Sequence, residues 1–211
     1  MFSVILSAKF NRNSVIFWLI YGLQSDKEMI TSERVIEQTK KWIADVVTGC
    51  NFCPFAARVI KQQTVFFKVE TATATDACLQ SFLQELARLD NDDAIETSFL
   101  IIPDGFKNFD DYLDLVSAAE KLLKKYHYNG IYQLASFHPQ YRFAGAPDND
   151  AANYTNRSVY PMLHLLRESS IDKALEHFDD LEGIPERNIN FAREKGINYM
   201  KMLRDNSFNN P

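Results

Sequence analysis

The sequence lacks the features that mark several classes of protein. It has no basic run, and 23 Lys and Arg against 28 Asp and Glu leave a net charge of −5. This balance argues against broad electrostatic binding to nucleic acid. Three cysteines, Cys50, Cys53 and Cys78, are too few for a disulfide scaffold and favour a reducing compartment, so we expect a cytoplasmic protein.

A long apolar run is also missing. The segment "VIFWLIYGL" at residues 15–23 is shorter than the roughly 20 residues that span a bilayer, so we expect no stable membrane insertion. Lys9 and Arg12 precede it, as in a secretory signal, but "QSDKEM" after it offers no small-x-small cleavage site. We expect residues 1–28 to be a loosely packed extension, upstream of a native start at Met29. A core strand and an uncleaved anchor are the alternatives.

From Met29 onward, strand and helix patterns alternate. Runs rich in β-branched and aromatic residues predict strands at residues 64–70, 97–102 and 131–137. Helical spacing and capping residues predict a helix from Ser32 to Gly49, a helix after an Asn108 cap, and helices at residues 54–61, 76–89, 161–168, 172–178 and 185–205. Residues 29–206 would form a single α/β domain, and residues 207–211 a disordered tail.

The element order implies two right-handed βαβ units. We therefore expect an α/β fold, with a small, mainly parallel sheet of three or more strands, helices packed around it and a C-terminal helical segment. The alternative is a ferredoxin-like α+β fold. That fold needs a further strand, which only residues 1–23 could supply.

The most unusual absence lies in the middle of the chain. Lys is missing between Lys125 and Lys173, and Glu between Glu120 and Glu168. His, Tyr, Arg, Asn, Asp and Ser replace them, and these side chains form directed hydrogen bonds. The segment follows the third predicted strand, and ligands of parallel sheets bind beyond the carboxyl ends of the strands. A functional loop is the prediction, and a meander whose Asn and Asp satisfy their own turns is the alternative.

Two residues are candidates for catalysis at this edge. Cys53 in "NFCPF" would cap the helix at 54–61, where amide groups and the helix dipole lower a thiol pKa. His138 ends the third strand before Pro139, which would leave its ring exposed. The alternatives are a buried apolar cysteine and a structural histidine. Zinc or redox chemistry at the Cys50–Cys53 pair is a weaker interpretation, because two further zinc ligands are missing.

Between Lys125 and Lys173, arginine is the only cationic residue type apart from histidine. Arg142, Arg157 and Arg167 have planar guanidinium groups that suit bidentate binding of carboxylate or phosphate, with salt bridges to Asp148 and Asp150 as the alternative. The full set of predicted substrate-binding residues is Asn51, Tyr141, Arg142, Asn153, Asn156, Arg157, His164 and Arg167. We predict no cofactor. His138, Asp148, Asp150 and His164 form an alternative divalent-metal site, although their spacing matches no established ligand pattern.

The motifs "NFCPFA", "SFHPQYRFAG" and "NYTNRSVYPMLHLLRE" resemble an uncharacterised, largely bacterial family known as domain of unknown function 1415. The resemblance covers about residues 31–203. The family pattern maps onto Asn51, Cys53, Pro54, Phe55, His138, Pro139, Tyr141, Phe143, Gly145, Asn153, Asn156, Arg157, Ser158, Pro161, His164 and Arg167. Cys50 and Val159 depart from it, and the first departure weakens the C-x-x-C interpretation. The family implies a shared polar site without naming its chemistry.

Several functions fit these residues. The first is an enzyme that acts on a small anionic metabolite by acyl or phosphoryl transfer or hydrolysis. Cys53 would serve as nucleophile or acid/base group, His138 as its base, and Arg142, Arg157 and Asn156 as anchors. The alternatives are a metal-dependent enzyme, a non-catalytic module that binds an anion or a peptide, and a purely structural hydrogen-bond network. The oligomeric state stays open.

Overall fold

The computed structural model describes residues 30–175 and 183–209, and Ser32–Pro211 forms one compact unit. The predicted extension at residues 1–28 lies outside the described residues. The centre of the unit is an open sheet of four strands in the order β1-β2-β4-β3. The strands are β1 (Val65–Val69), β2 (Thr97–Ile101), β3 (Tyr132–Phe137) and β4 (Met162–Arg167).

The prediction of a mainly parallel sheet is wrong, because β4 lies between β2 and β3. β1 pairs with β2 in parallel, but β4 runs antiparallel to both of its neighbours. β1, β2 and β3 still point the same way, as their predicted crossovers require. The mixed α/β class is therefore correct, and residues 162–167 supply a strand that was not predicted.

β4 occupies a segment for which a helix was predicted. Leu163 and Leu165 pack into the core on one face of the sheet, whereas His164 lines a cavity on the other. A strand covered on both faces is apolar on both sides, so its sequence shows little of the alternation that identifies a strand. This double coverage is the physical reason for the error.

Two helices, α4 (Thr75–Asn91) and α5 (Phe109–Lys125), cover one face of the sheet. As predicted, Asn108 caps α5, and its side chain accepts hydrogen bonds from the amides of Asp110 and Asp111. Leu86, Leu100 and Leu163 are nearly or fully buried in the core between these layers. Each such side chain stabilises the fold by about 1.5–3 kcal/mol relative to an exposed one.

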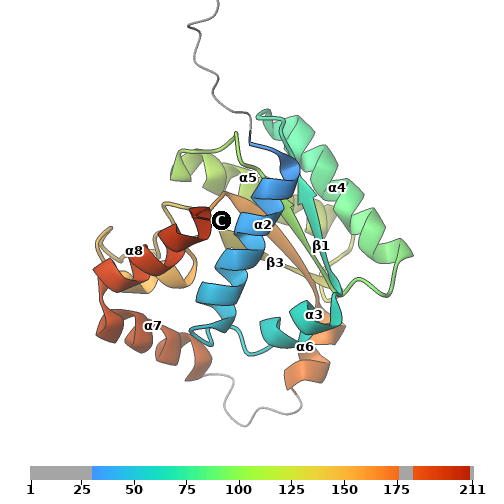
Figure 1. Cartoon of the computed structure of the whole chain (residues 1–211). Helices are drawn as coiled ribbons and strands as arrows, with labels where there is room; N and C mark the ends of the chain where they lie inside the picture. Colours follow the sequence, from blue (N-terminus) through green and yellow to red (C-terminus); the bar gives the residue numbers. More distant parts are fainter. Residues whose placement is uncertain (1–29, 176–182, 210–211) are drawn as a thin grey trace, which may run out of the picture. The chain divides into compact units, whose positions relative to one another are not determined.

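The opposite face is covered by α2 (Ser32–Trp42), its π-helical continuation η1 (Ile43–Thr48) and the short α3 (Ala56–Gln62), as Figure 1 shows. The predicted single helix thus changes register after Trp42. Gly49 follows η1 directly, where a Cβ atom would lie 2.3 Å from the Asp45 carbonyl oxygen. The absence of a side chain at Gly49 therefore permits this wide turn before "CNFC".

The C-terminal segment contains α6 (Glu168–Leu175), α7 (Gly183–Lys195) and α8 (Ile197–Asp205). The predicted helix at 185–205 is broken at Gly196, whose φ of 82° interrupts the helix. The predicted helix at 172–178 corresponds to α6, which begins four residues earlier, and residues 176–178 lie outside the described residues. Of the predicted tail at residues 207–211, the structure describes residues 207–209. Residues 206–208 form a 3₁₀ turn (η3), Ser207 is buried and Phe208 packs on Tyr160.

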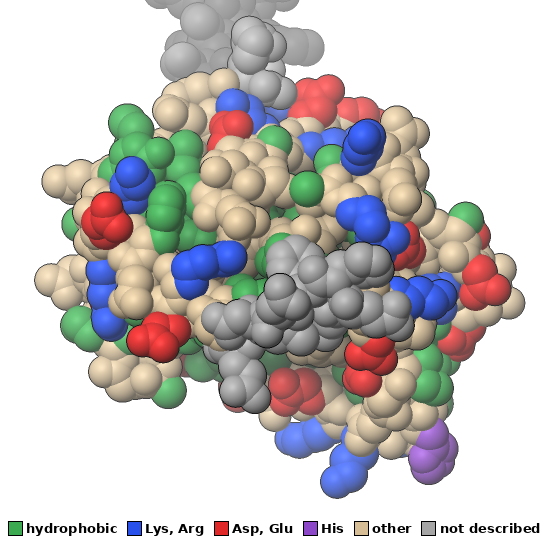
Figure 2. Space-filling model, turned by 90° about the horizontal axis from the view of Figure 1, so that it is seen from below, with side chains coloured by type: hydrophobic (Ala, Val, Ile, Leu, Met, Phe, Trp, Pro, Cys, Tyr) green, Lys and Arg blue, Asp and Glu red, His purple; other side chains and the backbone are tan. Residues whose placement is uncertain are grey.

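Charges of both signs share the face of the molecule that Figure 2 shows. In Figure 2, Lys and Arg side chains are interspersed with Asp and Glu on the visible face. Within residues 30–175 and 183–209, no helix is both long and apolar enough to cross a membrane.

Candidate functional site

A polar pocket lies where the connections after β2 and β3 meet. It has a volume of about 380 Å³ and is lined by Asn108, Phe109, Asp110, Pro139, Gln140, Arg142, Asp148, Tyr154, Arg157 and Arg204. We call it the arginine pocket. Because β1, β2 and β3 point the same way, their following connections reach one edge of the sheet. The sequence placed a polar site at this edge.

Arg157 is fixed in the arginine pocket by neutral partners. Its Nε donates to the Tyr141 carbonyl oxygen and its Nη2 to that of Asp148, both over 2.9 Å. Its guanidinium carbon lies 4.9 Å from the centre of the Tyr154 ring. Among the described residues, no carboxylate forms an ion pair with Arg157. Carbonyl oxygens orient a guanidinium without cancelling its charge, so Arg157 keeps a positive charge at a fixed position.

Two more guanidinium groups line the same pocket. Arg204 of α8 lies 5.5 Å from the Tyr154 ring and donates from Nη1 to the Pro139 carbonyl oxygen over 3.1 Å. Its other partner is the Asp205 carboxylate. Arg142 Nη1 lies 3.1 Å from Asp148 Oδ1, but their side chains are 47% and 79% exposed. An ion pair this exposed contributes little, so Arg142 is free to exchange Asp148 for another anion.

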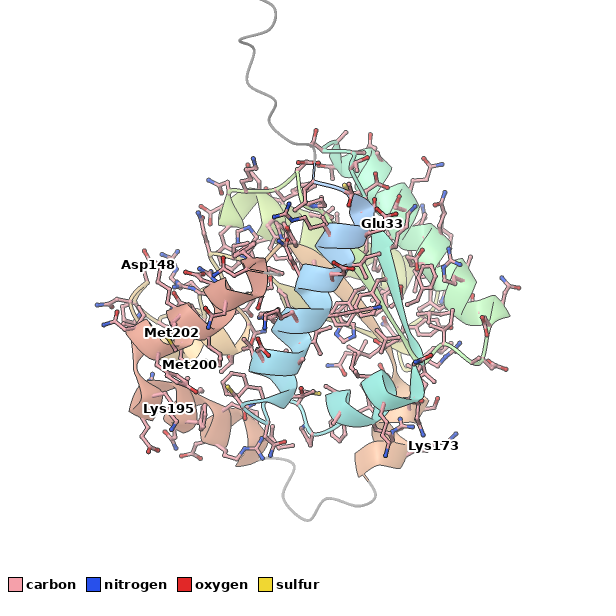
Figure 3. All side chains as sticks on the ribbon, in the orientation of Figure 1. Glu33, Asp148, Lys173, Lys195, Met200 and Met202 are labelled. Atoms are coloured by element: carbon pink, nitrogen blue, oxygen red, sulfur yellow. The ribbon has the colours of Figure 1, made fainter. Side chains whose placement is uncertain are left out.

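Arg204 was not predicted from the sequence. It lies almost fifty residues after Arg157, in a segment with ordinary charge, and no local motif marks it. It reaches the pocket because α8 packs beside the η2 turn (Ala151–Thr155). Figure 3 shows Asp148 on the same side of the molecule as α8 and Met202.

Three predicted ligand-binding residues form the scaffold of the loop. Asn153 is fully buried, and its side chain accepts from the Phe143 amide and donates to the Pro147 carbonyl oxygen. Asn156 Nδ2 donates to the Ser136 carbonyl oxygen, and Tyr141 contributes the carbonyl that holds Arg157. These contacts agree with the alternative of a structural hydrogen-bond network, because they satisfy backbone groups of the loop and of β3.

The prediction that the His138 ring is exposed at the sheet edge is wrong, because His138 is fully buried. Its Nδ1 accepts from the Gln140 amide over 3.0 Å, so Nε2 carries the proton and donates to the Phe106 carbonyl oxygen over 2.8 Å. Burial also lowers the His138 pKa below the ordinary value for histidine. Both ring nitrogens are therefore occupied by backbone groups, and neither is available as a base for Cys53.

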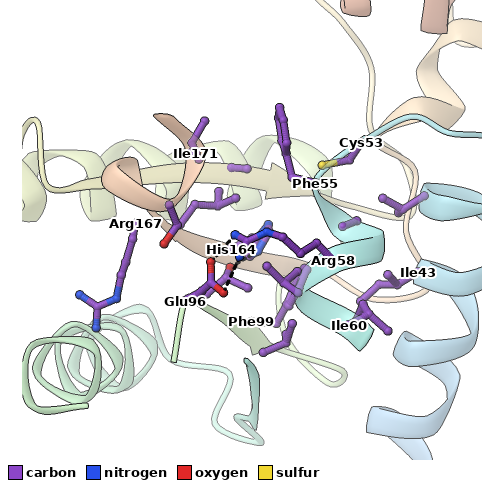
Figure 4. A pocket seen from close by; sticks show the side chains of 18 of the residues that line it. Ile43, Cys53, Phe55, Arg58, Ile60, Glu96, Phe99, His164, Arg167 and Ile171 are labelled. Atoms are coloured by element: carbon purple, nitrogen blue, oxygen red, sulfur yellow. Dashed lines mark hydrogen bonds and ion pairs between the residues drawn. The ribbon is translucent and has the colours of Figure 1, made fainter. Parts of the chain in front are cut away.

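Cys53 lines a separate, almost wholly apolar cavity of about 170 Å³. This cavity lies over the face of the sheet, between α3 and the strands, and not beyond their carboxyl ends (Figure 4). Burial raises the pKa of the Cys53 thiol, and this effect outweighs the hydrogen bonds from the Phe55 and Ala56 amides. The predicted lowering of the pKa is thus reversed. α3 has only seven residues and is too short for the "NFCPF" motif before it to reach the carboxyl end of β1.

His164 and Arg167 both line the same cavity, and in Figure 4 the guanidinium end of Arg167 points away from it. Arg167 donates to the Ile95, Leu89 and Asp92 carbonyl oxygens, and so closes the end of α4. His164 Nε2 contacts Thr97 Oγ1, and burial lowers the His164 pKa to about 3. His164 is therefore neutral at physiological pH.

The remaining candidates do not gather. Asn51, at a φ of 55°, lies outside both pockets, and its carbonyl oxygen accepts from Arg187. Asp150 is paired with Arg193 at 2.7 Å, and this arginine lowers the Asp150 pKa. Within the described residues, no group of three or more His, Cys, Asp or Glu side chains is placed to hold a metal ion. The alternative ligand set of His138, Asp148, Asp150 and His164 is thus not assembled.

The fold and these pockets define a mixed α/β protein with an open four-stranded sheet and an arginine-lined pocket at one edge. The chain belongs to the family described as "Protein of unknown function (DUF1415)", whose sequence profile matches residues 34–202. Comparisons with curated proteins and with solved structures gave no match.

Proposed function

We propose that the protein binds a small anionic molecule in the arginine pocket, through Arg142, Arg157 and Arg204. The observation that carries the proposal is the state of Arg157. Its guanidinium is fixed by carbonyl oxygens and by Tyr154, and no described carboxylate neutralises it. A fixed and unneutralised guanidinium loses little entropy when it binds a carboxylate or a phosphate.

The surroundings of Arg157 favour a small ligand with localised negative charge. Arg157 and Arg204 lie against the same Tyr154 ring, so an anion near that ring interacts with both charges. The first turn of α5 contributes Asn108, Phe109 and Asp110 to the lining, and the positive end of the helix dipole favours an anion there. Asp110 and Asp148 offset part of the positive charge, which disfavours large polyanions such as nucleic acids.

The geometry favours binding over catalysis by Cys53 and His138. Cys53 lines the other cavity, and both His138 ring nitrogens are bonded to backbone groups. Neither side chain lines the arginine pocket. Transfer or hydrolysis of an acyl or phosphoryl group would need a nucleophile at the pocket itself, and the predicted pair does not provide one.

Calorimetric titration tests this proposal with two simple probes, inorganic phosphate and succinate. We expect at least one of them to bind, and Arg157→Lys to weaken binding by about tenfold, because lysine lacks the guanidinium geometry. Arg58→Lys is a matched control away from the pocket, and Cys53→Ala tests the catalytic alternative. Both should bind as the wild type does. Equal affinity of Arg157→Lys and wild type, or loss of binding in Cys53→Ala, would contradict the proposal.

A further inference from the structure

The cavity that contains Cys53 and His164 has the properties of a second ligand site. It lies between α2, η1 and α3 and the face of the sheet, with α6 beside it, and it shares no lining residue with the arginine pocket. In Figure 4, Ile43 and Ile60 reach the cavity from helical segments, and Phe99 and His164 from strands. The two sites are therefore separate in position and in chemistry.

The size of this cavity matches one six-membered ring. Its volume is about 170 Å³, and its walls are formed mainly by apolar side chains, among them Trp42, Ile43, Val59, Phe99, Phe137 and Leu166. A dry apolar cavity of about 150 Å³ in another protein is large enough to bind benzene. Planar walls also favour a planar ligand, since the Phe99 ring is stacked on the His164 ring at 3.7 Å between centroids.

One polar atom in the wall distinguishes the site from a simple packing defect. The Thr97 hydroxyl donates its only hydrogen to the Leu165 carbonyl oxygen over 2.7 Å. The His164 Nε2 that contacts this hydroxyl must therefore be the donor, which leaves the lone pair of Nδ1 as an acceptor. Nδ1 has no hydrogen-bond partner among the residues that the structure describes and is not fully buried, and its side chain lines the cavity.

The other groups around the cavity are neutral or already paired. The raised pKa of Cys53 keeps its thiol protonated, and the low pKa of His164 keeps its ring neutral. Arg58 at the edge forms an ion pair with Glu96, with 42% and 16% of the two side chains exposed. A charged ligand would lose its hydration without gaining a counter-ion, so the cavity selects a neutral molecule.

From this geometry we infer that the cavity binds a neutral, single-ring aromatic molecule with one hydroxyl group, that is, a phenol. The ring fills the apolar space beside Phe99 and Phe137, and the hydroxyl donates its hydrogen to His164 Nδ1. This site is independent of the anion site that we propose above.

Calorimetric titration of the full chain with phenol and with toluene tests the inference. The two probes have similar shapes, but only phenol donates a hydrogen bond. Both should bind the wild type at one site. His164→Phe keeps an aromatic ring beside Phe99 and removes the acceptor, so phenol should bind about tenfold more weakly while toluene binds at least as well.

A second variant separates binding from folding. Ala135 lines the cavity from β3 and pairs with His164, so Ala135→Leu should fill the space and abolish binding of both probes. Ala87→Leu, at an exposed position of α4, is its matched control and should bind both as the wild type does. Absence of phenol binding to the wild type, unchanged phenol affinity in His164→Phe, or unchanged binding in Ala135→Leu would each overturn the inference. Arg157→Lys should leave phenol binding unchanged, so the two proposals fail separately.

Discussion

Trp42 donates its indole N–H to the backbone carbonyl oxygen of Arg157 over 3.2 Å. Trp42 belongs to α2 and lines the apolar cavity, whereas Arg157 lines the arginine pocket. The Trp42 ring also meets the Phe137 ring edge-on, at the end of β3. One buried side chain thus attaches the loop with the arginines to the layer of helices that forms the second cavity.

Trp42→Phe should lower the free energy of unfolding by about 1–3 kcal/mol, because the Arg157 carbonyl oxygen would lose its donor beside a fully buried ring. Urea denaturation measures this change. Tyr126→Phe is the control, since Tyr126 is 48% exposed and should change stability by no more than about 0.5 kcal/mol. If Trp42→Phe were as stable as the control, the hydrogen bond to Arg157 would have no structural importance.

Arg204→Gln should weaken anion binding about fivefold or more, because Arg204 lies against the same tyrosine ring as Arg157. Lys173→Gln is the control for net charge. It removes one positive charge at an exposed position that does not line the pocket. Titration with phosphate measures both variants. Equal weakening in the two would show that net charge, and not the pocket, controls the affinity.

Stability should fall as the pH is lowered below 6.5. The pKa values of His138 and His164 are both lowered by burial, the second to about 3, from an ordinary value of 6.5. Below pH 6.5 these histidines are protonated in the unfolded chain but not in the folded chain. Each of them therefore lowers the free energy of unfolding by at most about 1.4 kcal/mol per pH unit below 6.5.

Thermal unfolding between pH 7.5 and 5.5 tests this pH dependence. The carboxyls of Glu70 and Glu96 have pKa values below 4.5, so they titrate outside this range. His164→Phe should show a smaller loss of stability over the same interval. A pH dependence equal to that of the wild type would mean that His164 is protonated in the folded state.

Gly49→Ala should destabilise the protein by about 2 kcal/mol, although alanine usually favours a helix. The added Cβ would lie 2.3 Å from the Asp45 carbonyl oxygen, which would disturb the end of the π-helix. Urea denaturation measures the change. Ala44→Gly, the reverse substitution at an exposed position of the same segment, gives the ordinary difference in stability between alanine and glycine. Stabilisation by Gly49→Ala would show that the π-helix is not required.

Local signals in the sequence predicted much of the fold. Asn108 followed by two aspartates marked the start of α5, and β-branched and aromatic runs marked β1, β2 and β3, because these signals act within a few residues. β4 was not predicted, because both of its faces are covered and its sequence therefore does not alternate between apolar and polar residues. The change of register after Trp42 depends on a wide turn that hydrophobic periodicity does not reveal.

The candidate site was predicted only in part. The unusual composition around Arg142 and Arg157 identified one side of the arginine pocket, since both side chains lie on the loop after β3. Arg204 depends on how α8 packs, which is a long-range property. Cys53 and His138 lie in the motifs "NFCPFA" and "SFHPQYRFAG". Their chemistry depends on burial and on backbone contacts, which a motif does not reveal.

The most direct test of anion binding is a phosphate titration followed by NMR on ¹⁵N-labelled protein. We expect saturable shifts of the Nε–H signals of Arg142, Arg157 and Arg204 and of the backbone amides of Asp110 and Gln140. The Arg58 and Arg193 signals should remain unchanged. Shifts spread over exposed lysines and arginines, or none at the arginine pocket, would contradict the proposed function.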